Sequence, residues 1–218
     1  MSAEPVRTPR PGPRLLIFDF DGTLADSWPW LLDALDDTAL RFGLNRVTSA
    51  EAEALRGQDN RAVMRALGVP MWRLPRIATH MRRLAVEAPP PPLFPGIPDL
   101  LRRLTAAGRL LAIASSNTEA QIRRTLGPEL AGMVQHYALE ASLFGKATRF
   151  RRILRASGVP AADAIAIGDE VRDIEAAREA GVAAGAVGWG YAWPSLLAAR
   201  EPDALFDSPE AIARFCGA

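Results

Sequence analysis

The sequence contains almost no cysteine, since Cys216 is its only one. A disulfide within the chain is therefore excluded, and a reducing compartment is expected. An excess of charge of one sign is also lacking, because 26 basic residues face 25 acidic ones and the net charge is +1. No overall field favours nucleic acid or a membrane surface, so we expect neither as a partner.

Long hydrophobic runs are absent as well. The first apolar run, 15–18, is interrupted by Asp19 and is too short to span a membrane. Before it, residues 1–14 hold four prolines and three arginines without apolar periodicity, which indicates a disordered lead-in. This lead-in lacks the apolar middle of a signal peptide, so we expect a cytoplasmic protein.

Short apolar runs of strand length do occur, and they alternate with helical patterns. This alternation predicts an α/β fold with a doubly wound, Rossmann-like parallel sheet. Hydrophobic residues make up 49% of the 218 residues, which is enough for a sizeable core. The predicted strands are 15–18, 110–114, 137–139, 164–167, 183–187 and 204–206.

Residues 26–92 show no convincing strand and are predicted to form a small, all-helical cap. Its first helix would bury one face and end at Gly43. Further helices are expected at 48–56, with Thr48 as its cap, at 60–67 and around 72–86. The buried face of the first helix is predicted to carry Leu31, Leu35, Ala39 and Phe42. Four consecutive prolines, 89–92, suit a stiff return to the core. The core would then comprise 15–25 and 93–218.

The stretch that organises the chain follows the first strand. Asp19 and Asp21 come directly after the apolar run, and Gly22 allows the chain to turn at once. Alternate side chains of an extended segment share a face, so the two carboxylates begin on the same side. Two carboxylates this close require a cation to balance their charge, although an ordinary Asp-rich turn would have the same sequence.

Three further polar signals follow later strands: Ser115, Lys146 and the run from Asp169 to Asp173. Taken singly they are a helix cap, a surface amine and a charged helix N-terminus. Taken together, at the carboxyl edge of one sheet, they form a site for a phosphoryl group. Asp19 and Asp169 would hold Mg²⁺, while Lys146 and Ser115 would stabilise phosphoryl oxygens.

The four signals in this order resemble the haloacid dehalogenase-like (HAD) hydrolase superfamily, in particular its phosphoglycolate phosphatase-like members with a helical cap. The resemblance implies that Asp19 is the nucleophile that forms an aspartyl-phosphate, and that Asp21 is the general acid and then the general base. It implies Mg²⁺ binding by Asp19, the backbone carbonyl of Asp21, and Asp169, with Asp173 orienting the waters of the metal. The residues that would hold the phosphoryl group are Gly22, Thr23, Ser115, Ser116 and Lys146.

The expected activity is a Mg²⁺-dependent phosphomonoesterase acting on a small phosphorylated metabolite, as a monomer or weak dimer. A sugar-phosphate mutase would keep all four signals. A metal-free 2-haloacid dehalogenase would not need Asp21, and a non-catalytic regulatory module would not need any of them. Two positions depart from the phosphoglycolate phosphatases, since Asn117 replaces a frequent lysine and Glu170 a small hydroxyl residue.

The four polar signals assign no role to two further loops. The cap turn that contains Gly57 and Arg61 is expected to select the substrate, with solvated helix ends as the alternative. Trp189 and Tyr191, which lie among glycines after the fifth strand, are assigned to packing between loop and core.

Overall fold

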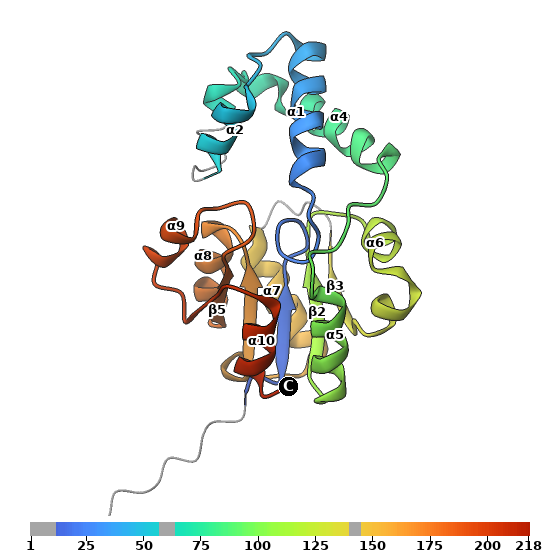
Figure 1. Cartoon of the computed structure of the whole chain (residues 1–218), viewed down its shortest axis with the longest axis vertical. Helices are drawn as coiled ribbons and strands as arrows, with labels where there is room; N and C mark the ends of the chain where they lie inside the picture. Colours follow the sequence, from blue (N-terminus) through green and yellow to red (C-terminus); the bar gives the residue numbers. More distant parts are fainter. Residues whose placement is uncertain (1–11, 57–63, 140–144) are drawn as a thin grey trace, which may run out of the picture.

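The computed structural model describes residues 12–56, 64–139 and 145–218 (Figure 1). A six-stranded sheet forms the body of the molecule, and the helices α1, α2 and α4 lie together at one end of it. The strands are β1 (Leu15–Phe18), β2 (Leu110–Ala114), β3 (His136–Ala138), β4 (Ala164–Gly168), β5 (Ala183–Val187) and β6 (Ala204–Phe206).

The sheet has the order β3-β2-β1-β4-β5-β6, and every pair of neighbours is parallel. The chain therefore winds outward from β1 in both directions, which confirms the predicted doubly wound α/β fold. The predicted strand boundaries agree with the structure to within one residue. β3 begins one residue earlier than predicted, and β4 extends one residue further, to Gly168.

β1 is buried on both faces, which explains why its sequence is apolar without alternation. Leu16 and Phe18 pack into one hydrophobic cluster, while Leu15 and Ile17 pack into another. The first cluster is covered by the helices α5 (Ile97–Ala106), α6 (Glu119–Gly132) and α10 (Pro209–Cys216). The second is covered by α7 (Gly145–Ser157), α8 (Val171–Ala180) and α9 (Pro194–Ala198).

The inserted segment 26–92 supplies α1 (Trp28–Phe42), α2 (Ser49–Leu55), the 3-10 turn η1 (Met71–Arg73) and α4 (Leu74–Glu87). Thr48 caps α2 as predicted, through a capping box with Glu51. The segment leaves and re-enters the core side by side, because Ala25 and Leu93 form an isolated antiparallel bridge. Its division from the core as a separate domain stays a prediction.

One detail of the helices differs from the prediction. α1 packs against α4 and buries Ala34, Thr38 and Ala39, a face adjacent to the predicted one. Of the predicted apolar face only Ala39 is buried, and its other members are partly exposed. α6 consists of two helical segments that meet at a kink at Gly127, where φ is 70° and ψ is 169°.

Some predictions cannot be compared with the structure. The lead-in 1–14 lies almost entirely outside the described residues, and so does the first half of the predicted helix 60–67; in its second half, residues 64–66 are helical. None of the helices in the described parts of the chain combines the length and apolar character that a membrane crossing requires.

Candidate active site

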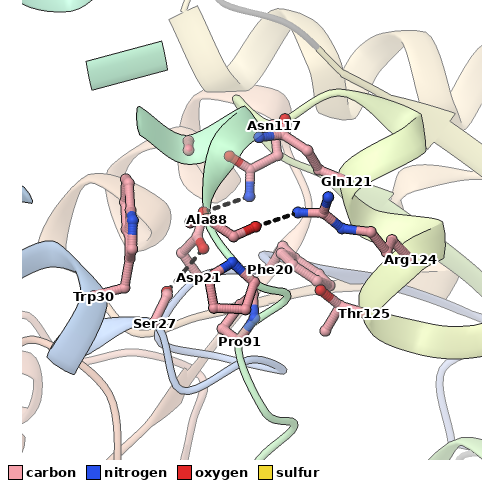
Figure 2. A pocket seen from close by; sticks show the side chains of 12 residues that line it. Phe20, Asp21, Ser27, Trp30, Ala88, Pro91, Asn117, Gln121, Arg124 and Thr125 are labelled. Carbon is pink, nitrogen blue, oxygen red and sulfur yellow. Dashed lines mark hydrogen bonds between the residues drawn. The ribbon is translucent and has the colours of Figure 1, made fainter. Parts of the chain in front are cut away.

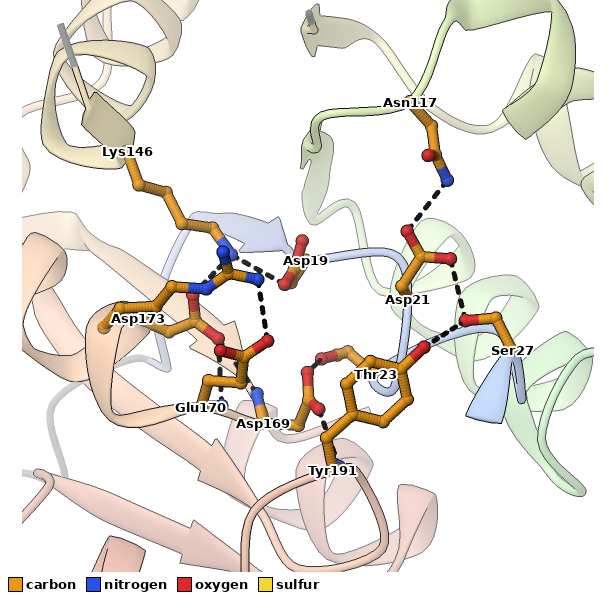
Figure 3. Close-up of polar contacts among 11 residues, drawn as sticks. Asp19, Asp21, Thr23, Ser27, Asn117, Lys146, Asp169, Glu170, Asp173 and Tyr191 are labelled. Carbon is orange, nitrogen blue, oxygen red and sulfur yellow. Dashed lines mark hydrogen bonds and ion pairs between the residues drawn. The ribbon is translucent and has the colours of Figure 1, made fainter. Parts of the chain in front are cut away.

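The sheet brings the predicted site residues together at its carboxyl edge. Asp19 and Asp21 follow β1, Ser115 follows the neighbouring β2, and Asp169 follows β4 on the other side. Lys146 reaches the same place from the first turn of α7. Because β1 lies between β2 and β4, three segments that are far apart in the chain meet around its end (Figure 3).

Lys146 lies between two buried carboxylates. Its Nζ is 2.7 Å from Asp19 Oδ2 and also donates to Asp173 Oδ1. Burial opposes the charge of this ammonium, but the carboxylates of Asp173 and Asp19 outweigh that effect and raise the pKa of Lys146. The amine is therefore protonated at neutral pH and supplies a fixed positive charge beside Asp19.

Three carboxylates converge in this site. One oxygen from each of Asp19, Asp169 and Asp173 lies within 4.8 Å of the others, and all three residues are buried. Burial, followed by the charges of Asp19 and Asp173, raises the pKa of Asp169 well above its ordinary value. Carboxylate oxygens are the ligands that a hard divalent cation prefers, so this oxygen-rich donor set fits Mg²⁺.

Asp173 is tied to the protein more closely than the other two. Its Oδ2 accepts hydrogen bonds of 3.1 Å from the backbone N–H groups of Asp169 and Glu170, and its Oδ1 accepts from Lys146. Both oxygens of Asp173 are therefore held by protein donors.

Asp21 turns away from Asp19 toward a separate set of partners (Figure 3). Ser27 Oγ donates to its Oδ1 over 2.8 Å, and Asn117 Nδ2 donates to its Oδ2 over 2.9 Å. Burial raises the pKa of Asp21 to about 6, and the hydrogen bond from Ser27 counteracts part of that rise. A carboxyl group that titrates near neutral pH can both give and take a proton.

A small pocket opens beside Asp21 (Figure 2). Phe20, Trp30, Asn117 and Arg124 contribute to its walls, and its volume is about 40 Å³. Arg124 closes one side of the pocket by donating to the carbonyl oxygen of Ala88 over 2.7 Å. The space next to the acid is thus sufficient for a group of a few atoms.

Residues 16–187 match the protein family described as "Haloacid dehalogenase-like hydrolase". The chain belongs to this family. A phosphoglycolate phosphatase of Synechococcus elongatus is 32% identical over 196 residues, which cover 89% of this chain and 92% of that protein. A phosphoglycolate phosphatase of Agrobacterium fabrum is 32% identical over 224 residues, covering 94% and 93%.

Solved structures show the same fold. A haloacid dehalogenase-like family protein from Streptococcus pneumoniae aligns with a TM-score of 0.78 at 24% identity, over 93% of this chain and 98% of that one. A putative phosphoglycolate phosphatase from Lactobacillus plantarum aligns with a TM-score of 0.81 at 21% identity, over 94% and 99%.

In this haloacid dehalogenase-like hydrolase, not every residue predicted to hold a phosphoryl group has a free polar group in the site. Ser115 is buried and its Oγ accepts from the backbone N–H of Asn117 over 3.1 Å, so its hydroxyl proton remains available. Ser116 is exposed. Thr23 Oγ1 instead donates to Asp169 Oδ1 over 2.8 Å, so its proton is already engaged.

Gly22 serves the hydrolase through its lack of a side chain. Its φ is 73°, and a Cβ at this position would lie 2.1 Å from Asp169 Oδ2. The glycine thus lets the loop after β1 approach the carboxylate that follows β4.

Three residues around the acid were not among the predicted site residues: Ser27, Asn117 and Tyr191. Tyr191 was assigned to packing, yet its hydroxyl lies 2.6 Å from Ser27 Oγ and its backbone N–H donates to Asp169 Oδ2 over 2.8 Å. The sequence distinguished Asn117 only as a position at which phosphoglycolate phosphatases frequently have a lysine. The predicted selectivity residues Gly57 and Arg61 lie outside the described residues.

Proposed function

We propose that this hydrolase is a Mg²⁺-dependent phosphomonoesterase that acts on a small phosphorylated metabolite. The observation that carries the proposal is the position of Lys146 Nζ, 2.7 Å from Asp19 Oδ2, inside the buried group formed by Asp19, Asp169 and Asp173. Phosphoryl transfer depends mainly on positioning and on balancing charge, and this arrangement supplies both.

Asp19 and Asp169 would hold the metal, together with the backbone carbonyl of Asp21, and Asp173 would orient its waters. When bound, Mg²⁺ neutralises the carboxylates and draws charge from the phosphoryl oxygens. Lys146 and Ser115 bind those oxygens from the protein side. The same role for Gly22, Thr23 and Ser116 stays a prediction, although the engaged hydroxyl of Thr23 favours a positioning role for that residue.

The reaction proceeds in two displacements. An oxygen of Asp19 bonds to phosphorus, the ester oxygen leaves, and Asp21 transfers its proton to that oxygen, which yields an alcohol and an aspartyl-phosphate. A water then attacks phosphorus, Asp21 takes its proton, and the bond to Asp19 breaks to release phosphate. A pKa of about 6 suits Asp21 to both steps.

The substrate is proposed to be small. The pocket beside Asp21 has a volume of about 40 Å³, and the leaving oxygen must lie within reach of that acid. The relatives named phosphoglycolate phosphatases support a short phosphorylated acid as the first compound to test. Recognition of the remainder by Gly57 and Arg61 stays a prediction.

The test is phosphate release from a panel of phosphorylated metabolites, with and without Mg²⁺, using Asp19→Asn as the inactive control. We expect release that depends on Mg²⁺ and stops in excess chelator, because unbalanced carboxylates repel a phosphate dianion. Undiminished turnover in chelator would contradict the metal site. Isomerisation of sugar phosphates without release would identify a mutase, chloride release from a 2-haloacid a dehalogenase, and inactivity on every compound a non-catalytic module.

A further inference from the structure

Arg56 connects the inserted helices to the core at a point above the active site. It caps the C-terminal end of α2, and its side chain reaches the loop 188–193 between β5 and α9. Its Nη2 donates to the carbonyl oxygen of Gly190 over 2.6 Å, and its Nε donates to that of Tyr191 over 3.3 Å. In Figure 1, α2 accordingly lies on the side of the molecule that carries α8 and α9.

The guanidinium of Arg56 is held on its other sides as well. Its Nη1 forms a 2.7 Å ion pair with Glu53, one turn earlier on α2. Its central carbon lies 5.3 Å from the ring centroid of Trp28, which begins α1, and 5.2 Å from that of Trp193, which precedes α9. A planar cation that stacks on two indoles and donates to two carbonyls uses properties that lysine lacks.

The loop that Arg56 binds also touches the proposed catalytic carboxylates. The backbone N–H of Tyr191 donates to Asp169 Oδ2, and the hydroxyl of Tyr191 contacts Ser27, which donates to Asp21. The backbone of Gly190 lies so close to Asp169 that a Cβ there would be 2.2 Å from the Cβ of Asp169. A displacement of this loop would therefore move the partners of both acids.

We propose that Arg56 is a positioning residue that couples the seating of the inserted helices to the placement of Asp169 and Asp21. This inference rests on the proposed function for the roles of those two acids. Arg56 acts through the loop 188–193, so it need not touch the substrate. The enzyme then reaches its full Mg²⁺ affinity and kcat only while α2 contacts this loop through Arg56.

The test compares Arg56→Met with Arg73→Met. Arg73 is a matched control, because it too donates to a backbone carbonyl, that of Phe42, and stacks on an indole, that of Trp72, but both of these contacts lie within the inserted segment. Mg²⁺ binding to the metal-free protein is measured by titration calorimetry. kcat and KM are measured with a small aryl phosphate, and folding is checked by the thermal unfolding transition.

For Arg56→Met we expect Mg²⁺ binding and kcat each to fall about tenfold, the effect of losing one charge-assisted hydrogen bond, with KM nearly unchanged. Arg56→Lys should fall between wild type and Arg56→Met, and Arg73→Met should match wild type. Arg56→Met that matches Arg73→Met in both measurements would overturn the proposal. A rise in KM alone would also overturn it, since Arg56 would then be a substrate ligand.

Two further outcomes are covered by the design. If Arg56→Met does not fold, Arg56→Lys decides, because weaker Mg²⁺ binding than wild type supports the proposal and unchanged binding overturns it. If the wild type hydrolyses no phosphomonoester, the proposed function fails, but the Mg²⁺ titration requires no turnover and still decides the role of Arg56.

Discussion

Thr23 Oγ1 donates a 2.8 Å hydrogen bond to Asp169 Oδ1 across 146 residues of sequence. Both residues are buried, and the other oxygen of Asp169 accepts from the backbone N–H of Tyr191. Each oxygen of this carboxylate therefore has one protein donor, which sets the direction in which its remaining lone pairs point. Asp169 is thus oriented from the loop after β1 and from the loop after β5 before any metal binds.

Replacing Thr23 by valine tests this orientation. The substitution keeps the shape of the side chain but leaves Asp169 Oδ1 without its buried donor, which costs about 1–3 kcal/mol. We expect a lower free energy of unfolding and weaker Mg²⁺ binding, measured by urea denaturation and titration calorimetry. Thr23→Ser keeps the hydroxyl and is the control. Equal behaviour of the valine and serine variants would show that the hydrogen bond does not orient Asp169.

Gly190 and Gly188 provide a matched pair of substitutions in one loop. A Cβ at Gly190 would lie 2.2 Å from the Cβ of Asp169 and 2.4 Å from the carbonyl oxygen of Gly22, whereas at Gly188 the nearest atom, in Pro194, is 3.4 Å away. Gly190→Ala should therefore displace Asp169 and lower kcat by about 100-fold, as misplacement of a reacting group does. Gly188→Ala should retain wild-type kcat. Retention of activity in both variants would contradict the close approach at Gly190.

The two aspartates after β1 should respond differently to conversion into asparagine. Asp19→Asn should abolish turnover, because an amide oxygen is a poor nucleophile. Asp21→Asn should lower kcat by a factor of roughly 100 to 10,000, the usual contribution of a general acid and base. Steady-state kinetics measures both effects. A fully active Asp21→Asn would refute its role, and an active Asp19→Asn would rule out the aspartyl-phosphate.

Asp21→Asn should also make the protein more stable at pH 7. Burial raises the pKa of Asp21 from 3.8 to about 6, so folding takes up a proton between these values and wild-type stability is lost as the pH rises through them. Asparagine cannot ionise, so the variant avoids this loss. From pH 4 to pH 7 the stability of Asp21→Asn relative to wild type should rise by about 2–3 kcal/mol.

Urea denaturation in chelator at both pH values measures this difference. The change in hydrogen bonding caused by the amide is the same at pH 4 and pH 7, so only the difference between the two pH values reports the carboxyl group. An identical stability difference at both would show that Asp21 titrates at its ordinary pKa.

The strands and the positions of the four polar signals could be predicted because their causes are local. A run such as 164–167 is apolar throughout only when both faces of the strand are covered, and parallel strands place the residues that follow them at one edge. The cap of α2 at Thr48 could be predicted for the same reason, because a capping box involves residues only three apart. Proximity of Asp19, Lys146 and Asp169 followed from these local patterns and the rules of sheet topology.

The amphipathic face of α1 could not be predicted in the same way. Helical periodicity identifies a stripe of apolar residues, but which part of the stripe is buried depends on the neighbouring helix. α4 packs against α1, and Thr38 Oγ1 donates to Met81 Sδ over 3.1 Å. Packing between the two helices therefore decides which of the adjacent faces of α1 is buried.

The sequence by itself determined the core sheet, the carboxylates at its edge and the family to which the chain belongs, because apolar period and short-range spacing encode them. Only the tertiary structure decided which groups surround Asp21 and what holds Asp169. The contacts of Asn117, Tyr191 and Arg56 join segments whose approach depends on loop paths and on the absence of a side chain at Gly190. No local sequence pattern predicts these contacts, because each partner alone has the sequence of an ordinary loop or helix end.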